Sequence, residues 1–228
     1  IRTQFPVALI DEFQDTDPIQ YRIFDAVYRV DQNDPETALV MIGDPKQAIY
    51  GFRGADIHAY LAARRATTGR HYTLAVNFRS TKAVVSACNQ LFGHAEQHPR
   101  GAFRFHTDPE AENPIPYVEI TANGRADRLL IAGEPAPAMT FWRYDDGEAV
   151  TSPGVYLDQM AAAAASEVAR WLTQARASRT GFADADGGFR LLRPKDIAIL
   201  VRTGSEAATM RAALAARGIH SVYLSDRD

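Results

Sequence analysis

The sequence is poor in cysteine and contains no long apolar run, and both absences narrow the classes of protein to which it can belong. Cys88 is the single cysteine among 228 residues. One cysteine excludes an internal disulfide framework and a cysteine-rich zinc site, and it fits a reducing compartment. No apolar run approaches the roughly 20 residues that a membrane helix needs, and no signal peptide is visible. We therefore expect a cytoplasmic protein with no membrane partner.

Neither sign of charge is in excess. The chain carries 25 Lys and Arg against 28 Asp and Glu, for a formal net charge of -3. A strongly basic nucleic-acid module is therefore excluded, and any DNA contact must come from a local surface or from other parts of a longer protein. The six histidines show no metal-binding spacing such as HExxH. Because the first residue is Ile1 and an apolar run follows almost at once, we expect a piece of a longer chain.

Short apolar runs alternate with helical patterns, which predicts an α/β fold of parallel sheets with crossover helices. Strands are predicted at 7–11, 38–42, 72–76, 117–120, 139–144, 196–201 and 219–224. Helices are predicted at 17–30, 57–65, 80–92, 157–177 and 205–217. An irregular excursion near 93–150 and a loop at 180–188 are also expected. We expect two α/β units with a boundary near residue 70.

Two adjacent carboxylates, Asp11 and Glu12, follow the first apolar run. A buried parallel strand that ends in acids delivers them to the edge where open α/β sheets bind ligands. In a nucleotide-hydrolysing motor, Asp11 would bind Mg²⁺ and Glu12 would polarise the attacking water. The alternative is a pair of solvated acids that caps the strand end. Gln14 and Asp15 favour the site, because four polar groups after a buried strand are costly unless they serve one.

A second polar cluster follows the next apolar run. Asp44 lies at the end of that predicted strand, which would place it near Glu12 if the two strands are adjacent. Gln47 carries a neutral amide that could hydrogen-bond a γ-phosphate or its attacking water and so sense hydrolysis. The same glycine-flanked loop contains Tyr50 and Phe52, which are suited to stacking on bases. For Phe52 the alternative is a core aromatic.

Two arginines also belong to these clusters. Arg53 could pair with a phosphate or with an acid. Arg79 follows the third apolar run, across the expected domain boundary from the acids, and this placement is that of an arginine finger acting in cis. For Arg79 the alternative is a structural arginine–carboxylate pair. Phe78 could pack on an adenine, or it could be a buried aromatic.

Taken together, the clusters resemble the UvrD/Rep-like superfamily 1 DNA helicases. The matching segments are 9–21 (motif II), 42–57 (motif III) and 74–81 (motif IV), in the order and spacing of that family. The tetrapeptide Asp44-Pro45-Lys46-Gln47 resembles motif III of the RecB branch, whose members are helicase–nuclease subunits. Departures exist: Phe52 stands where UvrD-like members more often carry Trp.

The resemblance implies a RecA-like P-loop NTPase fold, with residues 1–71 from the first RecA-like domain and 72–228 from the second. It implies ATP and Mg²⁺ as cofactors, with Mg²⁺ on Asp11 and Glu12 as the catalytic base. Gln47 would couple the γ-phosphate to the DNA surface, and Arg79 would be the arginine finger. The other implied positions are Phe78 and Asp44 at the nucleotide, and Phe52, Arg53 and Tyr50 at DNA.

The implied function is an ATP-dependent DNA helicase of a RecBCD-type exonuclease V in recombinational repair, with single- and double-stranded DNA and RecC-like and RecD-like subunits as partners. The sequence contains no Gly-x-x-x-x-Gly-Lys-[Ser/Thr] loop, which that family places upstream, so we expect these residues alone not to hydrolyse ATP. Motifs V and VI and any nuclease motif are also missing from the sequence. The alternatives are a stand-alone UvrD/Rep-type helicase and a non-catalytic scaffold with a helicase fold.

Overall fold

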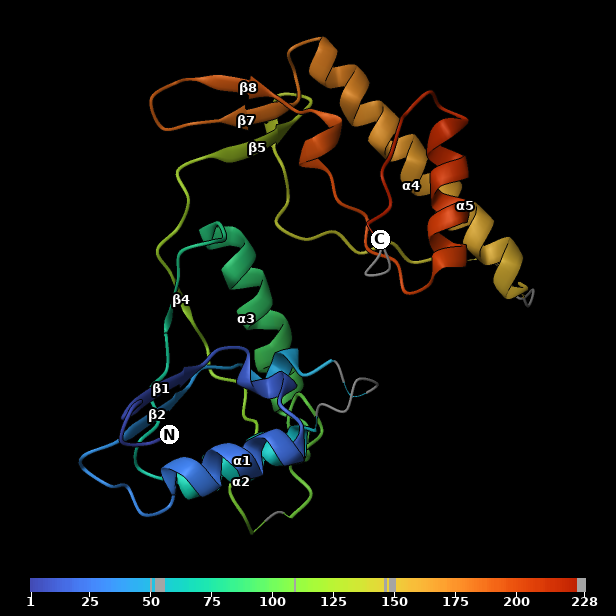
Figure 1. The fold of residues 1–228 in the computed structure, drawn as a ribbon. Helices are drawn as coiled ribbons and strands as arrows, with labels where there is room; N and C mark the ends of the chain where they lie inside the picture. Colours follow the sequence, from blue (N-terminus) through green and yellow to red (C-terminus); the bar gives the residue numbers. More distant parts are fainter. Residues whose placement is uncertain (50, 52–55, 109, 146, 148–150, 225–228) are drawn as a thin grey trace. The chain divides into compact units, whose positions relative to one another are not determined.

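The computed structural model describes residues 1–49, 51, 56–108, 110–145, 147 and 151–224, and it divides into two compact units. Unit 1 comprises Ile1–Val76 and Cys88–Thr121. Unit 2 comprises Asn77–Ala87 and Ala122–Asp228. Helices and strands are mixed along the chain, which confirms the α/β class (Figure 1). The RecA-like assignment and the boundary between residues 71 and 72 stay predictions.

Unit 1 begins with a parallel pair of strands joined by a helix. β1 (Val7–Ile10) lies in parallel register with β2 (Ala38–Met41), and the crossover between them contains α1 (Pro18–Tyr28). The predicted strand–helix–strand succession is therefore confirmed. Because both strands run the same way, the residues that follow each of them emerge at one edge of the pair.

The N-terminus of α1 is fixed by its cap. Asp17 Oδ1 accepts hydrogen bonds from the backbone N–H groups of Ile19 (2.7 Å) and Gln20 (2.9 Å). The Gln20 side chain accepts in return from the Asp17 N–H, which completes a capping box, and Pro18 occupies the first helical position. These contacts satisfy amides that a helix start otherwise leaves unpaired. They also set where the polar segment between β1 and α1 must end.

A buried aromatic side chain joins that segment to two helices. Phe13 belongs to the 3₁₀ turn η1 (Phe13–Asp15), and its side chain is buried. Its ring contacts Tyr21 on α1 at 5.9 Å and Tyr60 on α2 (Ile57–Ala66) at 6.0 Å between centroids. α1 and α2 contact one another as well, and Figure 1 shows α2 behind α1. Phe13 thus anchors the segment that carries the acids in the core of unit 1.

Much of the segment expected to be irregular is packed against α3 (Lys82–Glu96). Asn89 accepts hydrogen bonds from the Tyr117 hydroxyl (2.7 Å) and the Ile120 N–H, and donates to the Ile120 carbonyl (2.9 Å). Phe92 stacks on Tyr117 with ring centroids 5.4 Å apart. The Asn89 side chain takes up both backbone hydrogen-bonding groups of Ile120, so these groups are not paired with a neighbouring strand. The strand predicted at 117–120 is therefore wrong. Pairing begins one residue later, at β4 (Thr121–Ala122), which pairs with β3 (Val76–Asn77).

Unit 2 contains an antiparallel sheet that the sequence patterns did not predict. Its order is β6 (Glu134–Pro135), β5 (Arg128–Ile131), β7 (Gly181–Ala183) and β8 (Phe189–Leu191). β7 and β8 form a hairpin across the segment predicted to be only a loop, and that part of the prediction is wrong. The strands have two to four residues each, too short for an alternating apolar pattern to stand out.

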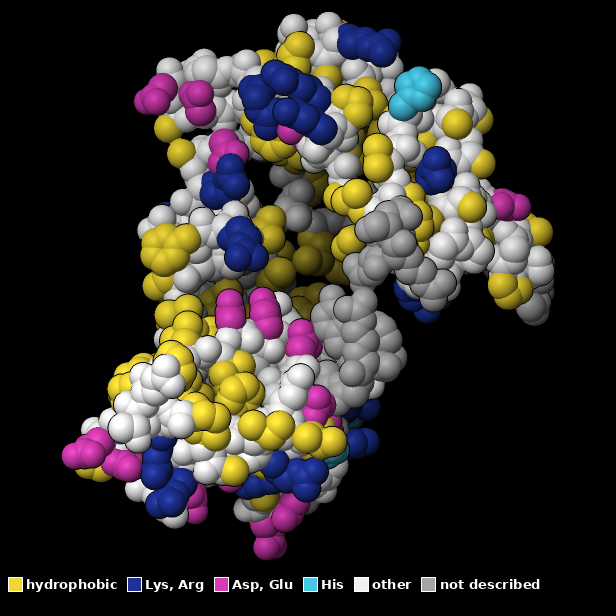
Figure 2. Space-filling model, viewed as in Figure 1, with side chains coloured by type: hydrophobic (Ala, Val, Ile, Leu, Met, Phe, Trp, Pro, Cys, Tyr) yellow, Lys and Arg dark blue, Asp and Glu magenta, His cyan; other side chains and the backbone are white. Residues whose placement is uncertain are grey.

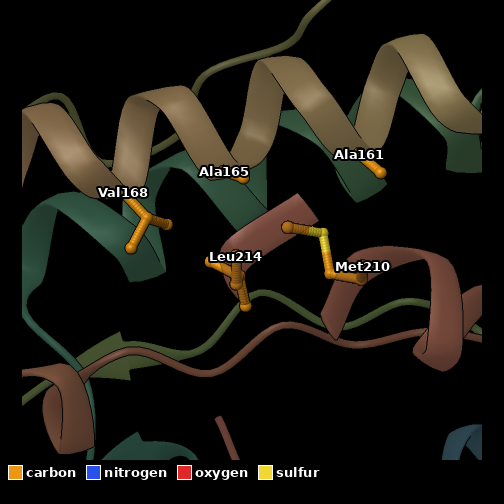
Figure 3. Packing of buried hydrophobic residues seen from close by; sticks show 5 residues of the cluster. All are labelled: Ala161, Ala165, Val168, Met210 and Leu214. Carbon is orange, nitrogen blue, oxygen red and sulfur yellow. The ribbon is translucent and has the colours of Figure 1, made fainter. Parts of the chain in front are cut away.

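The core of unit 2 lies between two helices. α4 (Pro153–Arg176) and α5 (Gly204–Ala215) pack along each other, and Figure 3 shows the five buried side chains between them. These are Ala161, Ala165, Val168, Met210 and Leu214. Small alanines on α4 let α5 approach closely, and Met210 and Leu214 fill the remaining space. The alanine-rich run thus serves helix packing.

Several predicted strands are wrong for one physical reason. Residues 72–75, 139–144, 197–201 and 219–224 are assigned to no strand, because none pairs with a neighbouring strand among the described residues. The side chains of Tyr72 and Leu200 are 97% and 96% exposed. Apolar residues alone do not make a strand, since the backbone also needs a partner.

Among the residues that the structure describes, no helix is both long and apolar enough to cross a membrane.

Candidate functional site

The candidate site begins where β1 ends. Asp11 and Glu12 follow Ile10 directly, and both are exposed. Asp11 Oδ1 accepts a hydrogen bond from the Glu12 backbone N–H at 2.9 Å. The next N–H, that of Phe13, donates to the carbonyl of Ile42 just beyond β2 at 2.8 Å. The two acids are therefore presented to solvent by a segment whose backbone is tied to both strands.

Glu12 has an unusual backbone conformation. Its φ of 51° and ψ of 42° lie in the left-handed region. For a residue with a side chain this costs about 1–2 kcal/mol. The turn persists because Asp11 bonds the Glu12 N–H and because Phe13 is locked in the core. Strain of this kind that is held by its surroundings is characteristic of functional positions.

Gln14 connects the first acidic segment to the second. Its side chain is only 1% exposed. Gln14 Nε2 donates to Glu12 Oε2 at 2.7 Å, and Gln14 Oε1 accepts from the Asp44 backbone N–H at 3.1 Å. We call these two hydrogen bonds the Gln14 bridge. In the sequence, Gln14 gives only support for the acids, and its single signal is a polar residue directly after a buried strand.

Asp44 continues the network to Gln47. Asp44 lies before the 3₁₀ turn η2 (Pro45–Gln47), and its carboxylate accepts from the Lys46 N–H (3.0 Å) and the Gln47 side-chain amide (3.2 Å). The Lys46 ammonium lies 2.8 Å from the same carboxylate. Burial alone would raise the pKa of Asp44, but the hydrogen bonds and charge of Lys46 and the Gln47 amide outweigh it and lower the pKa. Asp44 is thus held as a carboxylate that orders the turn carrying Gln47.

A hollow of about 410 Å³ opens beside the acids. Asp11, Glu12 and Asp15 line it, together with Ile23 and Phe24 from α1. Asp15 Oδ1 is buried and has no hydrogen-bond partner among the described residues. The hollow therefore combines an acidic wall with an apolar one.

The donor set suits Mg²⁺ held together with a ligand phosphate. Mg²⁺ commonly takes one or two protein carboxylates and keeps waters or phosphate oxygens in its other positions. Asp11 uses Oδ1 for the Glu12 N–H, which leaves Oδ2 for a cation. In the described part of the chain, no group of three or more acidic, histidine or cysteine side chains is arranged to hold a metal by itself. The residues therefore fit a shared site better than a closed protein cage.

The remaining predicted residues belong to other parts of the chain. Phe78 and Arg79 belong to unit 2, directly after β3, where Asn77 Oδ1 accepts from the N–H groups of Arg79 (2.9 Å) and Ser80 (2.8 Å). Phe78 is 71% exposed, which contradicts the alternative of a buried aromatic. No described carboxylate is within ion-pair distance of Arg79. The roles of both residues stay predictions.

Three predicted DNA contacts, Tyr50, Phe52 and Arg53, lie outside the described residues. Their roles stay predictions too. Among the described residues, the structure brings Glu12, Asp44 and Gln47 into one hydrogen-bonded network, with Asp11 adjacent to it.

Comparison with known proteins places this geometry in a family context. Residues 1–68 match the UvrD/REP helicase N-terminal domain. The whole chain is 44% identical to the RecBCD enzyme subunit RecB of Escherichia coli, and 38% identical to that of Haemophilus influenzae. It is 33% identical to the RecB subunit of Mycobacterium tuberculosis, again over its full length. The predicted resemblance to the RecB branch is confirmed.

The chain spans less than a fifth of the length of these relatives, at 18%, 17% and 19% respectively. The similarity therefore covers one region of a much longer protein.

Proposed function

We propose, from the premise that this chain is a RecB-like segment of the UvrD/Rep-like helicases, that it forms part of the ATP-driven DNA motor of a RecBCD-type enzyme. Residues 1–71 would belong to a first RecA-like domain and 72–228 to a second. The parent would act in the cytoplasm on single- and double-stranded DNA in recombinational repair. RecC-like and RecD-like subunits would be its partners, and exonuclease activity would come from other parts of it.

One observation carries the proposal. Glu12, at the end of β1, is hydrogen-bonded through Gln14 to Asp44, at the end of β2, and Asp44 holds Gln47. Two sequence segments about 30 residues apart, each matching a helicase motif, thus share one network at the edge where α/β proteins bind ligands. Solvated acids that merely cap a strand would not need a buried amide between them.

The chemistry that we propose is water attack on the γ-phosphate of ATP. Glu12 accepts the proton of the attacking water, and Gln47 contacts the γ-phosphate or that water. Asp11 binds Mg²⁺, which when bound neutralises charge on the phosphates. Arg79 stabilises the charge that develops on the transferred group, as an arginine finger does.

The remaining residues serve the ligands at either side of this chemistry. Asp44 orders the turn of Gln47 at the nucleotide, and Phe78, which is exposed, packs on the adenine. Phe52 and Tyr50 stack on bases of single-stranded DNA, and Arg53 links that surface to the nucleotide site.

The test is ATP hydrolysis by the complete parent subunit, wild type against Glu12→Gln, with and without single-stranded DNA. The amide keeps the size of the side chain and its hydrogen-bonding reach but cannot take up a proton. Turnover should fall by about a hundredfold or more, while binding of a fluorescent ATP analogue is retained.

A matched control is Glu134→Gln, because Glu134 lies in β6 of unit 2 and has no part in the proposed chemistry. It should hydrolyse ATP as the wild type does. Unchanged turnover in Glu12→Gln would contradict the motor and favour a non-catalytic scaffold. Loss of turnover in a parent without DNA-degrading activity would instead favour a stand-alone UvrD/Rep-type helicase.

A further inference from the structure

We propose that Gln14 is a positioning residue: it aims the Glu12 carboxylate at the attacking water and ties it to the turn that carries Gln47. The inference rests on the proposed function, since it assigns a role within the same reaction. The family motifs imply roles for the acids and for Gln47 but none for Gln14. The Gln14 bridge is seen only in the structure.

Burial makes the choice of glutamine informative. An amide enclosed in a protein is costly unless both of its ends are hydrogen-bonded, and an apolar side chain of the same length would fill the space without that requirement. At Gln14 both ends are bonded, one to the Glu12 carboxylate and the other to the Asp44 N–H. Packing alone therefore does not explain an amide here.

The hydrogen bond leaves Glu12 able to act as a base. Gln14 engages Oε2 only, so Oε1 keeps its lone pairs for a proton. A lysine or arginine in the same place would orient the carboxylate too, but it would also neutralise its charge. A neutral amide donor fixes direction and leaves the charge in place, which is what a general base needs.

Gly43 supports the bridge from the other side. A Cβ at this position would lie 2.7 Å from Gln14 Oε1 and 3.0 Å from the Gln14 backbone nitrogen. The second loop can therefore approach Gln14 only because residue 43 has no side chain. The close approach is what lets the Asp44 N–H reach Gln14 Oε1.

The first test is Gln14→Met in the complete parent subunit. Methionine keeps the length and fills the space but can neither donate to Glu12 nor accept from Asp44. We expect kcat to fall about tenfold or more while KM for ATP changes less than about threefold, because a misplaced base affects the chemical step and not ground-state binding. A kcat within twofold of wild type would overturn the inference.

The second test is Gln14→Glu, which keeps the size of the side chain and an acceptor for the Asp44 N–H but lacks the amide N–H that Gln14 donates to Glu12. We expect kcat to fall about tenfold or more while KM for ATP changes less than about threefold. A kcat within twofold of wild type would overturn the inference, and this variant decides if Gln14→Met does not fold.

Thr180→Val is the matched control. Thr180 is also fully buried, and its hydroxyl bridges the Ala132 N–H (3.0 Å) and the Gln174 side chain (3.2 Å) in unit 2. Losing this bridge should lower Tm and leave kcat unchanged. An equal loss of kcat in Thr180→Val would mean that any buried polar deletion impairs turnover, which overturns the special role of Gln14.

Combining Gln14→Met with Glu12→Gln separates the inference from the proposed function. If Gln14 acts through Glu12, the double variant is no slower than Glu12→Gln alone. A further drop in the double variant would contradict action through Glu12. If Glu12→Gln itself retains full turnover, the proposed function fails; if only Gln14→Met does, the inference alone fails.

Discussion

Gly43 is a position at which the candidate site has no room for a side chain. Its missing side chain leaves room for the Gln14 amide and for the backbone of Phe13, whose nitrogen would lie 3.1 Å from an added Cβ. The three atoms nearest to an added Cβ are Gln14 Oε1 and the backbone nitrogens of Gln14 and Phe13. The two backbone nitrogens cannot rotate away. The glycine is therefore required by a close approach and not by its own backbone angles.

We expect Gly43→Ala to lower the free energy of unfolding by about 1–3 kcal/mol, as overpacking does in other interiors, and to lower kcat by displacing the Gln14 bridge. Chemical denaturation and steady-state ATP hydrolysis of the complete subunit measure the two effects. Gly154→Ala is the matched control, because an added Cβ there meets nothing within 4 Å. A Gly43→Ala variant with wild-type kcat would contradict the described packing.

At the scale of single residues, the sequence predicted that Asp44 lies near Glu12, but it did not predict that Gln14 connects them. Asp11, Glu12 and Asp44 follow apolar runs, and the parallel arrangement brings such residues to one edge. The role of Gln14 depends on the left-handed backbone at Glu12 and on the bare Cα of Gly43, and neither has a periodic signal. For Tyr50, Phe52 and Arg53 the structure adds no geometry.

At the scale of the elements, the contact between α4 and α5 can be tested by substitutions on one helix. Ala165 is fully buried at the centre of the contact in Figure 3, whereas Ala163, two residues earlier on the same helix, is exposed. Leucine and alanine both favour helices, so a substitution at either position changes packing far more than helix propensity.

Ala165→Leu should therefore lower the free energy of unfolding by about 1–3 kcal/mol through overpacking, while Ala163→Leu should stay within about 0.5 kcal/mol of wild type. Circular dichroism melts of the two variants provide the comparison. Equal stability of the two would mean that α5 does not cover Ala165 in solution.

The sequence predicted helices better than strands for physical reasons. Each helix from α1 to α5 was expected to within a few residues, because periodicity and capping residues such as Asp17 act locally. The β1–β2 pair was also expected, since its crossover is short. β5 pairs with β7 across more than 50 residues of chain, with Arg128 opposite Ala183, and a local pattern cannot reveal so distant a partner.

Over the whole molecule, many large apolar side chains lie on the surface. Figure 2 shows hydrophobic side chains across the face of unit 1 that carries α1, where Ile19 and Ile23 are exposed. On β1, Val7 and Leu9 are exposed too. Exposed apolar surface is characteristic of sites that contact other proteins. It fits a chain that spans less than a fifth of its relatives.

We expect the isolated 228-residue chain to hydrolyse ATP no faster than buffer, because its sequence contains no phosphate-binding loop. It should also bind an apolar fluorescent dye strongly and self-associate, whereas the complete subunit should do neither. Dye titration, light scattering and an ATPase assay on the two proteins test this. Glu12-dependent turnover by the isolated chain would contradict it.

The left-handed backbone of Glu12 has a consequence for directed evolution. Replacing this residue with glycine would relieve the local strain, since glycine adopts such angles at little cost. If Glu12 is the catalytic base that we propose, a screen that rewards heat resistance alone would therefore enrich inactive variants at position 12. At this residue a substitution that raises thermal stability would lower activity. A directed-evolution screen of this protein therefore has to select for stability and activity together.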